Sequence, residues 1–238
     1  MKIKINQMLA LGGAGLLTLS VAQAASITWG ATGSFTDNTV LTLAGAAANE
    51  VYGVDFGAGV QTTANSYTFS DYTAGNMTMS GPSSSYNGFL GNSTTGDSSF
   101  DTVLANAIYG GGFGQPGGLG GTLNNLTVGQ NYTVMALLVI PWNQGATFVL
   151  NDDISDSPSQ QYGYNTYDSV NPVALPGGYI MGTFTADATT QALNIITTPG
   201  ASSQYAAILL EAAPVPEPGV CALFGGGVML LFALRRKK

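Results

Sequence analysis

LNNLTVGQNYTVMALLVI, residues 123–140, is the stretch that decides the fold. Its two halves, residues 123–128 and 131–140, are separated by Gly129 and Gln130, which are typical of a turn. The second half is almost continuously apolar, as expected of a strand that is covered on both faces. The stretch therefore predicts a hairpin whose second strand lies in the middle of a sheet.

Strand-like segments continue on both sides of this stretch. Residues 179–186 and 191–197 are expected to pair as a second hairpin around residues 187–190. Residues 100–109 fit a strand or a short helix, and we favour the strand. About ten strands joined by Gly, Asn and Pro turns predict an all-β fold, a β-sandwich of jelly-roll type. The other expected strands are residues 26–29, 39–43, 50–56, 66–69, 76–80, 146–150, 162–167 and 205–211.

A glycine-rich segment, residues 110–121, contains G-x-G-x-x-G at residues 112–117. A dinucleotide fingerprint needs a strand before it and a helix after it, so that the helix N-terminus meets the pyrophosphate. The segment that follows, residues 122–128, is strand-like and turn-like. We therefore interpret the glycines as a surface loop.

The charge of residues 25–213 excludes several classes of function. All six Lys and Arg residues lie outside this range, and the chain has no His. Without cations the range cannot neutralise phosphates, so nucleic acid is excluded as a partner. It also has no Ser-His-Asp triad, and Cys221, the single cysteine, lies beyond it. Its acids are Asp37, Glu50, Asp55, Asp71, Asp97, Asp101, Asp152, Asp153, Asp156, Asp168, Asp187 and Glu211.

The N-terminus, residues 1–24, has the three parts of a secretory signal peptide. Lys2 and Lys4 supply the positive region, residues 8–21 are apolar, and Ala22-Gln23-Ala24 is an A-x-A cleavage site. We expect export through the inner membrane, with a mature chain that begins at Ala25.

The C-terminus, residues 214–238, also has three parts in a fixed order. It reads PVPEPGVCALFGGGVMLLFALRRKK. A proline motif is followed by an apolar run at residues 220–234 and a basic end at residues 235–238. The run spans roughly 22 Å as a helix, short of a hydrocarbon core of about 30 Å. The residues of interest are Val215, Pro216, Glu217 and Pro218 in the motif, with Arg235 and Arg236 in the basic end.

This order resembles the PEP-CTERM sorting signal of exported proteins from Gram-negative bacteria. The resemblance rests on Pro216-Glu217-Pro218, the apolar run and Arg235-Arg236. It implies an exosortase-like processing enzyme as partner, transient membrane attachment through the C-terminal helix, and exopolysaccharide in the surroundings. The alternative is an ordinary single-pass C-terminal anchor. The chain is thus divided into a signal peptide (1–24), a β-sandwich domain (25–213) and a sorting signal (214–238).

The middle domain has a looser resemblance of its own. The order of its strands and turns is similar to that of jelly-roll accessory domains of exported proteins. The segments that carry this similarity are NLTVGQNYTV (125–134), GTFTADATTQALNI (182–195) and AAILLE (206–211). This similarity implies a fold and carries no ligand residue.

Two groups of residues are candidate binding sites. Asp152, Asp153 and Asp156 could hold Ca²⁺, which prefers oxygen ligands, and the alternative is a solvated turn. Asp97 with Asp101 is a second candidate of that kind. For sugar we expect contacts from exposed rings and amides, and the alternative is that these rings pack the core. The candidate sugar contacts are Trp142, Asn143, Tyr162, Tyr164 and Tyr167.

The sequence thus predicts a protein that is not an enzyme, at the cell surface or in the extracellular matrix of a Gram-negative bacterium. It is sorted by its C-terminal signal and has exopolysaccharide as an expected partner, without a cofactor. The alternative is a calcium-stabilised, lectin-like sugar-binding domain. A glycosidase with a pair of carboxylates is the least favoured class, since no spacing selects a pair.

Overall fold

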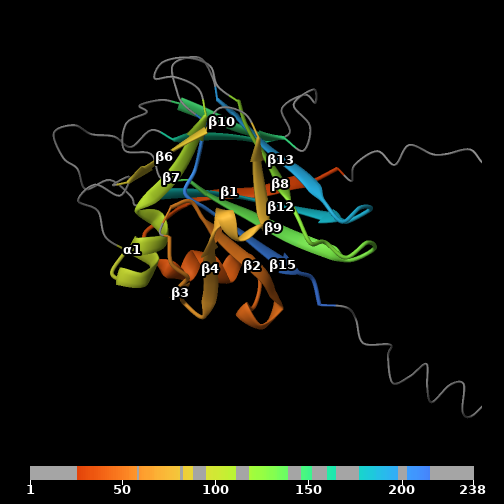
Figure 1. The fold of residues 1–238 in the computed structure, drawn as a ribbon, viewed down its shortest axis with the longest axis horizontal. Coiled ribbons are helices and arrows are strands. Elements are labelled where there is room, and N and C mark those ends of the chain that lie inside the picture. Colours follow the sequence, from red (N-terminus) through yellow and green to blue (C-terminus); the bar gives the residue numbers. More distant parts are fainter. Residues whose placement is uncertain are drawn as a thin grey trace, which may run out of the picture.

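The computed structural model describes residues 26–57, 59–80, 83–87, 95–110, 118–138, 146–151, 160–164, 177–197 and 203–214. Most of these residues lie in strands, and the sheets have a sandwich-like arrangement (Figure 1), which confirms the expected mostly-β fold. The predicted terminal helices lie outside the described residues.

The first sheet has seven strands in the order β1-β12-β9-β15-β2-β4-β3. Neighbouring strands are antiparallel except β2 and β4, which are parallel. The labels β1, β12, β9 and β15 mark strands that lie side by side in Figure 1. The bounds are β1 Thr28–Phe35, β12 Gly177–Thr185, β9 Asn131–Leu138, β15 Ala207–Ala212, β2 Glu50–Asp55, β4 Tyr67–Asp71 and β3 Thr62–Ala64.

Two smaller sheets and four short helices complete the described structure. The second sheet has the order β11-β10-β13-β8-β5, and the third β14-β7-β6. The second sheet comprises β11 Gln160–Tyr164, β10 Ala146–Asn151, β13 Gln191–Thr197, β8 Gly118–Leu123 and β5 Met77–Ser80. The third comprises β14 Ser203–Tyr205, β7 Asn106–Gly110 and β6 Ser83–Asn87. The helices are η1 Asn38–Leu43, η2 Ala47–Asn49, η3 Tyr72–Ala74 and α1 Ser98–Leu104.

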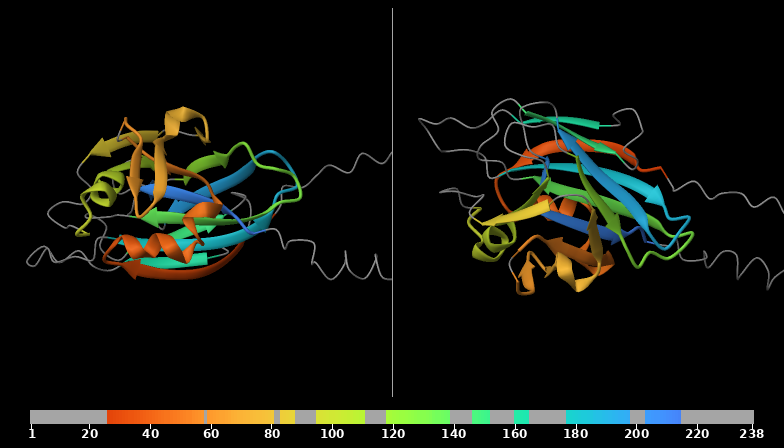
Figure 2. Two further views of the ribbon diagram at one scale, coloured as in Figure 1. Left: turned by 90° about the horizontal axis from the view of Figure 1, so that it is seen from below. Right: turned by 45° about the horizontal axis from the view of Figure 1, so that its top comes forward.

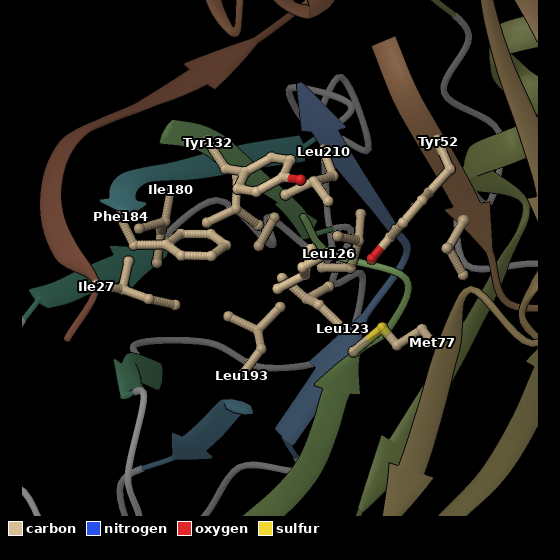
Figure 3. Packing of buried hydrophobic residues seen from close by; sticks show 14 of the residues in the cluster. Ile27, Tyr52, Met77, Leu123, Leu126, Tyr132, Ile180, Phe184, Leu193 and Leu210 are labelled. Atoms are coloured by element: carbon tan, nitrogen blue, oxygen red, sulfur yellow. The ribbon is translucent and has the colours of Figure 1, made fainter. Parts of the chain in front are cut away.

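Strand β9 is the central strand that its apolar sequence predicts. Val134, Ala136 and Leu138 pack into a core between the first and second sheets, and Met135 and Leu137 pack into a second core on the other face. Figure 3 shows the first core, in which side chains of both sheets meet. The second core is completed by Val40 and Leu41 of η1 and by Phe100, Val103 and Leu104 of α1.

Both predicted hairpins are wrong. Residues 123–128, expected as the first strand of one hairpin, are not a strand beyond Leu123, the last residue of β8, and in both cases the strands before and after the connection belong to different sheets. β8 belongs to the second sheet and β9 to the first, and the same holds for β13 and β12. The connections, residues 124–130 and 186–190, are corners that bond to each other: Leu126 N donates to Thr189 O (3.0 Å) and Gly129 N to Ala186 O (2.7 Å). Each strand needs cover on its apolar face, and the opposite sheet supplies it.

Figure 2 shows these two corners at one end of the first sheet and α1 at the other. The described chain also begins and ends on the corner side. Thr28 near its start is opposite Thr183, and Ala213 N near its end donates to Asn131 O (2.8 Å). The first and last described residues therefore lie at the same end of the domain.

Three further segments differ from their predicted elements or refine them. Residues 39–43, expected as a strand, form η1, because Asp37 Oδ1 accepts a hydrogen bond from Thr39 N (2.9 Å) and starts a helical turn. Residues 100–109, for which we favoured a strand, contain both α1 and β7. The glycine-rich segment, expected as a surface loop, has its last four residues, 118–121, in β8, so a strand rather than a helix follows residues 112–117.

Among the described residues, no helix is both long and apolar enough to span a bilayer. The apolar run at residues 220–234 lies outside that part of the chain.

Candidate functional site

A row of polar residues crosses five strands of the first sheet. Thr28 of β1 is opposite Thr183 of β12, which is opposite Thr133 of β9, and the row continues through Glu211 of β15 to Glu50 of β2. Residues in directly opposite positions project to the same side of a sheet. Their chain neighbours Val134 and Leu210 belong to the core between the sheets. The polar row therefore lies on the other face of the first sheet.

The threonine end of the polar row borders an open hollow of about 550 Å³, which we call the hydroxyl groove. Thr28, Thr183 and Thr185 are exposed and Thr133 is half-buried. Thr185 Oγ1 donates to Asn131 Oδ1, which fixes the amide at the edge of the groove. The groove is lined by Ser26, Thr28, Asn131, Tyr132, Thr133, Thr183, Phe184, Thr185 and Ala213, none of which carries a charge.

Tyr132 and Phe184 do not provide an open aromatic surface in the hydroxyl groove. Their rings stack on each other with centroids 5.4 Å apart and belong to the core between the sheets. They are 3% and 5% exposed. The groove therefore offers hydroxyl and amide groups rather than a ring face.

At its other end the polar row brings two carboxyl groups together, because β2 contains a bulge. Leu210 is opposite Tyr52, but the next residue, Glu211, is opposite Glu50, so Val51 is the extra residue. Regular alternation would place Glu50 on the face of Tyr52. An extra residue reverses the alternation and places Glu50 beside Glu211.

Glu211 is buried, with only 2% of its surface exposed. Within the described part of the chain its Oε1 has no hydrogen-bond partner, and a Cβ at Gly45 would overlap with its Oε2. Burial raises the pKa of Glu211 to about 7, and the charge of Glu50 adds to this effect. The opposing influence on this pKa is a hydrogen bond with Tyr67.

Glu211, Glu50 and Tyr67 form a group that we call the carboxyl cluster. Both oxygens of Glu50 accept from Thr68 N, at 2.8 and 3.0 Å. Burial raises the pKa of Glu50, although its bonds with the backbone of Thr68 and Gly53 oppose that shift. Tyr67 Oη donates to Gly45 O at 2.7 Å. The carboxyl cluster thus brings together residues of β2, β4 and β15, and Tyr67 bonds it to the segment before η2.

The carboxyl cluster was not predicted, although the sequence carries a signal for it. Glu50 and Glu211 are the only glutamates in residues 25–213, and each lies at the end of an expected strand. Their proximity depends on strand order and on the bulge at Val51, which no local pattern indicates.

Asp97 and Asp101, the second candidate calcium pair, make structural hydrogen bonds. Asp97 caps α1 by accepting from Ser99 N (2.9 Å) and Phe100 N (3.3 Å). Asp101 Oδ1 accepts from Thr95 N (2.7 Å) and Thr95 Oγ1 (2.6 Å). Within the described part of the chain, no three acidic, His or Cys side chains gather into a metal-binding group.

Most of the other predicted site residues lie outside the described residues. Tyr162 and Tyr164 are in β11, opposite Phe148 and Ala146 of β10. Those not described are Trp142, Asn143, Tyr167, Asp152, Asp153, Asp156, Val215, Pro216, Glu217, Pro218, Arg235 and Arg236.

Comparison with known proteins adds no family to these observations. A scan against protein-family models found no match, and a search of curated proteins found none either.

Proposed function

We propose that this chain is an exported, non-catalytic protein of the cell surface or extracellular matrix that associates with neutral exopolysaccharide. Two features of the sequence support its export and sorting: the signal-like residues 1–24 and the tripartite order of residues 214–238. The partner in sorting would be an exosortase-like enzyme, and residues 220–234 would attach the chain to the membrane. The organism would be a Gram-negative bacterium.

The hydroxyl groove is the observation that supports polysaccharide as the partner. Its polar side chains are uncharged donors and acceptors, among them Thr28, Thr133, Thr183, Thr185, Asn131 and Ser26. The surrounding domain, residues 25–213, contains no cation. A neutral, hydroxyl-rich chain matches these groups, whereas a phosphate-rich or strongly acidic polymer would be repelled.

For the fold we propose jelly-roll connectivity within the sandwich-like arrangement. Chain segments that alternate between the facing sheets support it, namely β8 to β9 and β12 to β13. These crossings at paired corners are typical of two-sheet jelly rolls.

The sorting part of the proposal is tested by the intact mass of the protein recovered from its host. We expect the native chain to end between residues 215 and 218. A variant in which Pro216, Glu217 and Pro218 are all replaced by Ala should keep its apolar tail. A full-length tail in both proteins would instead indicate an ordinary membrane anchor.

The binding part is tested by retention of the full chain on immobilised dextran and galactan. Thr133→Val with Thr183→Val removes two hydroxyl groups and keeps the branched shape of both side chains. We expect dissociation constants to rise by about thirtyfold, because each of the two lost hydrogen bonds contributes about 1 kcal/mol. Thr190→Val is the matched control, since Thr190 is exposed and lies outside the groove. Equal retention of all three proteins would contradict a role for the groove.

A further inference from the structure

The carboxyl cluster has no positive charge to compensate its two acids. Glu50 and Glu211 are directly opposite each other on adjacent strands. Residues 25–213 contain no Lys, Arg or His. Among the described residues that pack around Glu211, the titratable groups are Glu50 from β2 and Tyr67 from β4. Glu211 is buried and Glu50 is half-buried, so ionising both carboxyl groups costs free energy.

The hydrogen bonds of the cluster indicate where a proton would lie. Tyr67 Oη carries one proton, and it donates that proton to Gly45 O. The hydrogen bond between Tyr67 and Glu211 lowers the pKa of Glu211, so it is a bond that the ionised carboxylate accepts from Tyr67. When Glu211 is ionised, it and Gly45 O compete for the same Tyr67 proton. One buried acceptor is then left without its partner.

We propose that Glu211, Glu50 and Tyr67 form a proton-operated latch on the end of β15. While the two carboxyl groups hold one proton between them, Glu211 stays beneath Gly45. When that proton leaves to solvent, repulsion by Glu50 drives Glu211 outward, and the end of β15 loosens from its neighbours.

Among the described residues, few other bonds would hold the strand end after the latch opens. Beyond the ladder of β15, Ala213 N donates to Asn131 O (2.8 Å), and Gln130 Nε2 donates to Ala213 O (2.9 Å). The proline motif begins at Val215, directly after Pro214. The latch would therefore control how closely this motif is held to the domain, a consequence that rests on the proposed sorting signal.

The direction of the pH effect follows from where the proton binds. The folded state holds its proton to a higher pH than the unfolded chain does, because the pKa of Glu211 is raised from 4.5 to about 7. The stabilising effect is fully present below about pH 4.5 and is lost as pH rises through about 7. The latch is thus held in weak acid and open in mild alkali.

Amide hydrogen exchange of residues 207–213 tests the latch directly, using the full chain in a mild neutral detergent. After correction for the intrinsic pH dependence of exchange, we expect protection to fall about tenfold between about pH 5.5 and about pH 8.5. Glu211→Gln should remain protected at both pH values, because a neutral amide does not ionise and is not repelled by Glu50. Asp187→Asn is the control, since it removes one exposed acid without touching the latch.

Glu50→Gln gives a second, independent reading. Removing the like charge should move the loss of protection to lower pH values, because Glu50 raises the proton affinity of Glu211. A profile that matches the wild type would contradict the role of Glu50 in the latch. An infrared C=O band of a protonated carboxyl at about pH 6 that is absent from Glu211→Gln would identify the proton itself. Wild-type protection that does not change with pH, or a Glu211→Gln profile that matches the wild type, would overturn the latch. Neither result bears on the mass test for sorting.

Discussion

The side chain of Asp97 connects two parts of the chain that are far apart in sequence. One oxygen accepts from Ser99 N and Phe100 N at the start of α1, and the other accepts from Asn38 Nδ2 in η1. The bond from Asn38 is the main reason that the pKa of Asp97 is lowered. A side chain that the sequence offered as a calcium ligand is therefore a helix cap.

Asp97→Ala should lower the free energy of unfolding by about 1–2 kcal/mol, because it removes an N-cap and leaves Asn38 without its acceptor. The measurement is urea unfolding at neutral pH. Asp187→Ala, at an exposed position, should stay within about 0.5 kcal/mol of the wild type. Since the pKa of Asp97 is lowered in the folded state, its contribution should disappear as pH falls through that pKa. Equal losses in both variants would contradict the capping role.

Gly45 allows the backbone to lie directly against Glu211. Its φ of 154° lies outside the range that most residues adopt, and a Cβ there would overlap with Glu211 Oε2. Gly129 has a φ of 85° and has open space around it. Comparing the two glycines separates backbone strain from the close approach.

Gly45→Ala should therefore destabilise the protein more than Gly129→Ala. We expect about 1 kcal/mol for the backbone strain at Gly129 and at least about 2 kcal/mol at Gly45, where Glu211 must also move. Thermal unfolding of both variants in parallel provides the measurement. If Gly45→Ala costs no more than Gly129→Ala, the carboxyl cluster is not packed as described.

Strand β9 shows which properties follow from the local sequence pattern and which from the tertiary structure. Its apolar run indicates a central strand, and the structure places it between β12 and β15 with cores on both faces. The polar start of the same strand, Asn131 and Thr133, borders the hydroxyl groove. One strand thus contributes both to stability and to the candidate binding surface.

Met135→Ala and Thr133→Val should separate these two contributions, because the residues are two apart on the same face of β9. Met135 is fully buried, and its truncation should cost about 2–5 kcal/mol. Thr133→Val keeps the shape of a half-buried side chain and should change stability by less than about 1 kcal/mol. Urea unfolding measures both. A large loss in Thr133→Val would mean that the groove threonines serve the fold rather than a ligand.

The element most clearly misjudged from sequence is η1. Residues 39–43, TVLTL, have the branched and apolar composition of a strand. Asp37 nevertheless caps a helical turn at Thr39, and this turn buries Val40 and Leu41 in the second core. A segment of this length is too short for periodicity to distinguish the two structures.

At the scale of the whole molecule, charge is distributed very unevenly. Residues 25–213 carry twelve acids and no cation. Self-repulsion among these acids destabilises the compact state, and salt screens it. Raising NaCl should therefore raise the melting temperature steadily, whereas a protein held by ion pairs would lose stability. A melting temperature that falls with NaCl would contradict this account.

The same titration distinguishes general screening from a specific calcium site. At equal ionic strength, CaCl2 and MgCl2 should stabilise the full chain equally if screening alone acts. An additional, saturating rise with CaCl2 would favour the calcium-stabilised alternative and direct attention to Asp152, Asp153 and Asp156, because a ligand bound by the native state stabilises it.

The sequence by itself determined the mostly-β class, the positions of several strands, including β2, β4, β5, β10 and β13, and the absence of cations from residues 25–213. These properties depend on composition and on alternation between near neighbours. Only the tertiary structure decided which strands pair, that the two expected hairpins are corners between sheets, and that the bulge at Val51 brings Glu50 beside Glu211. Register and sheet membership are set by contacts between residues far apart in the chain, and a local sequence pattern does not predict such contacts.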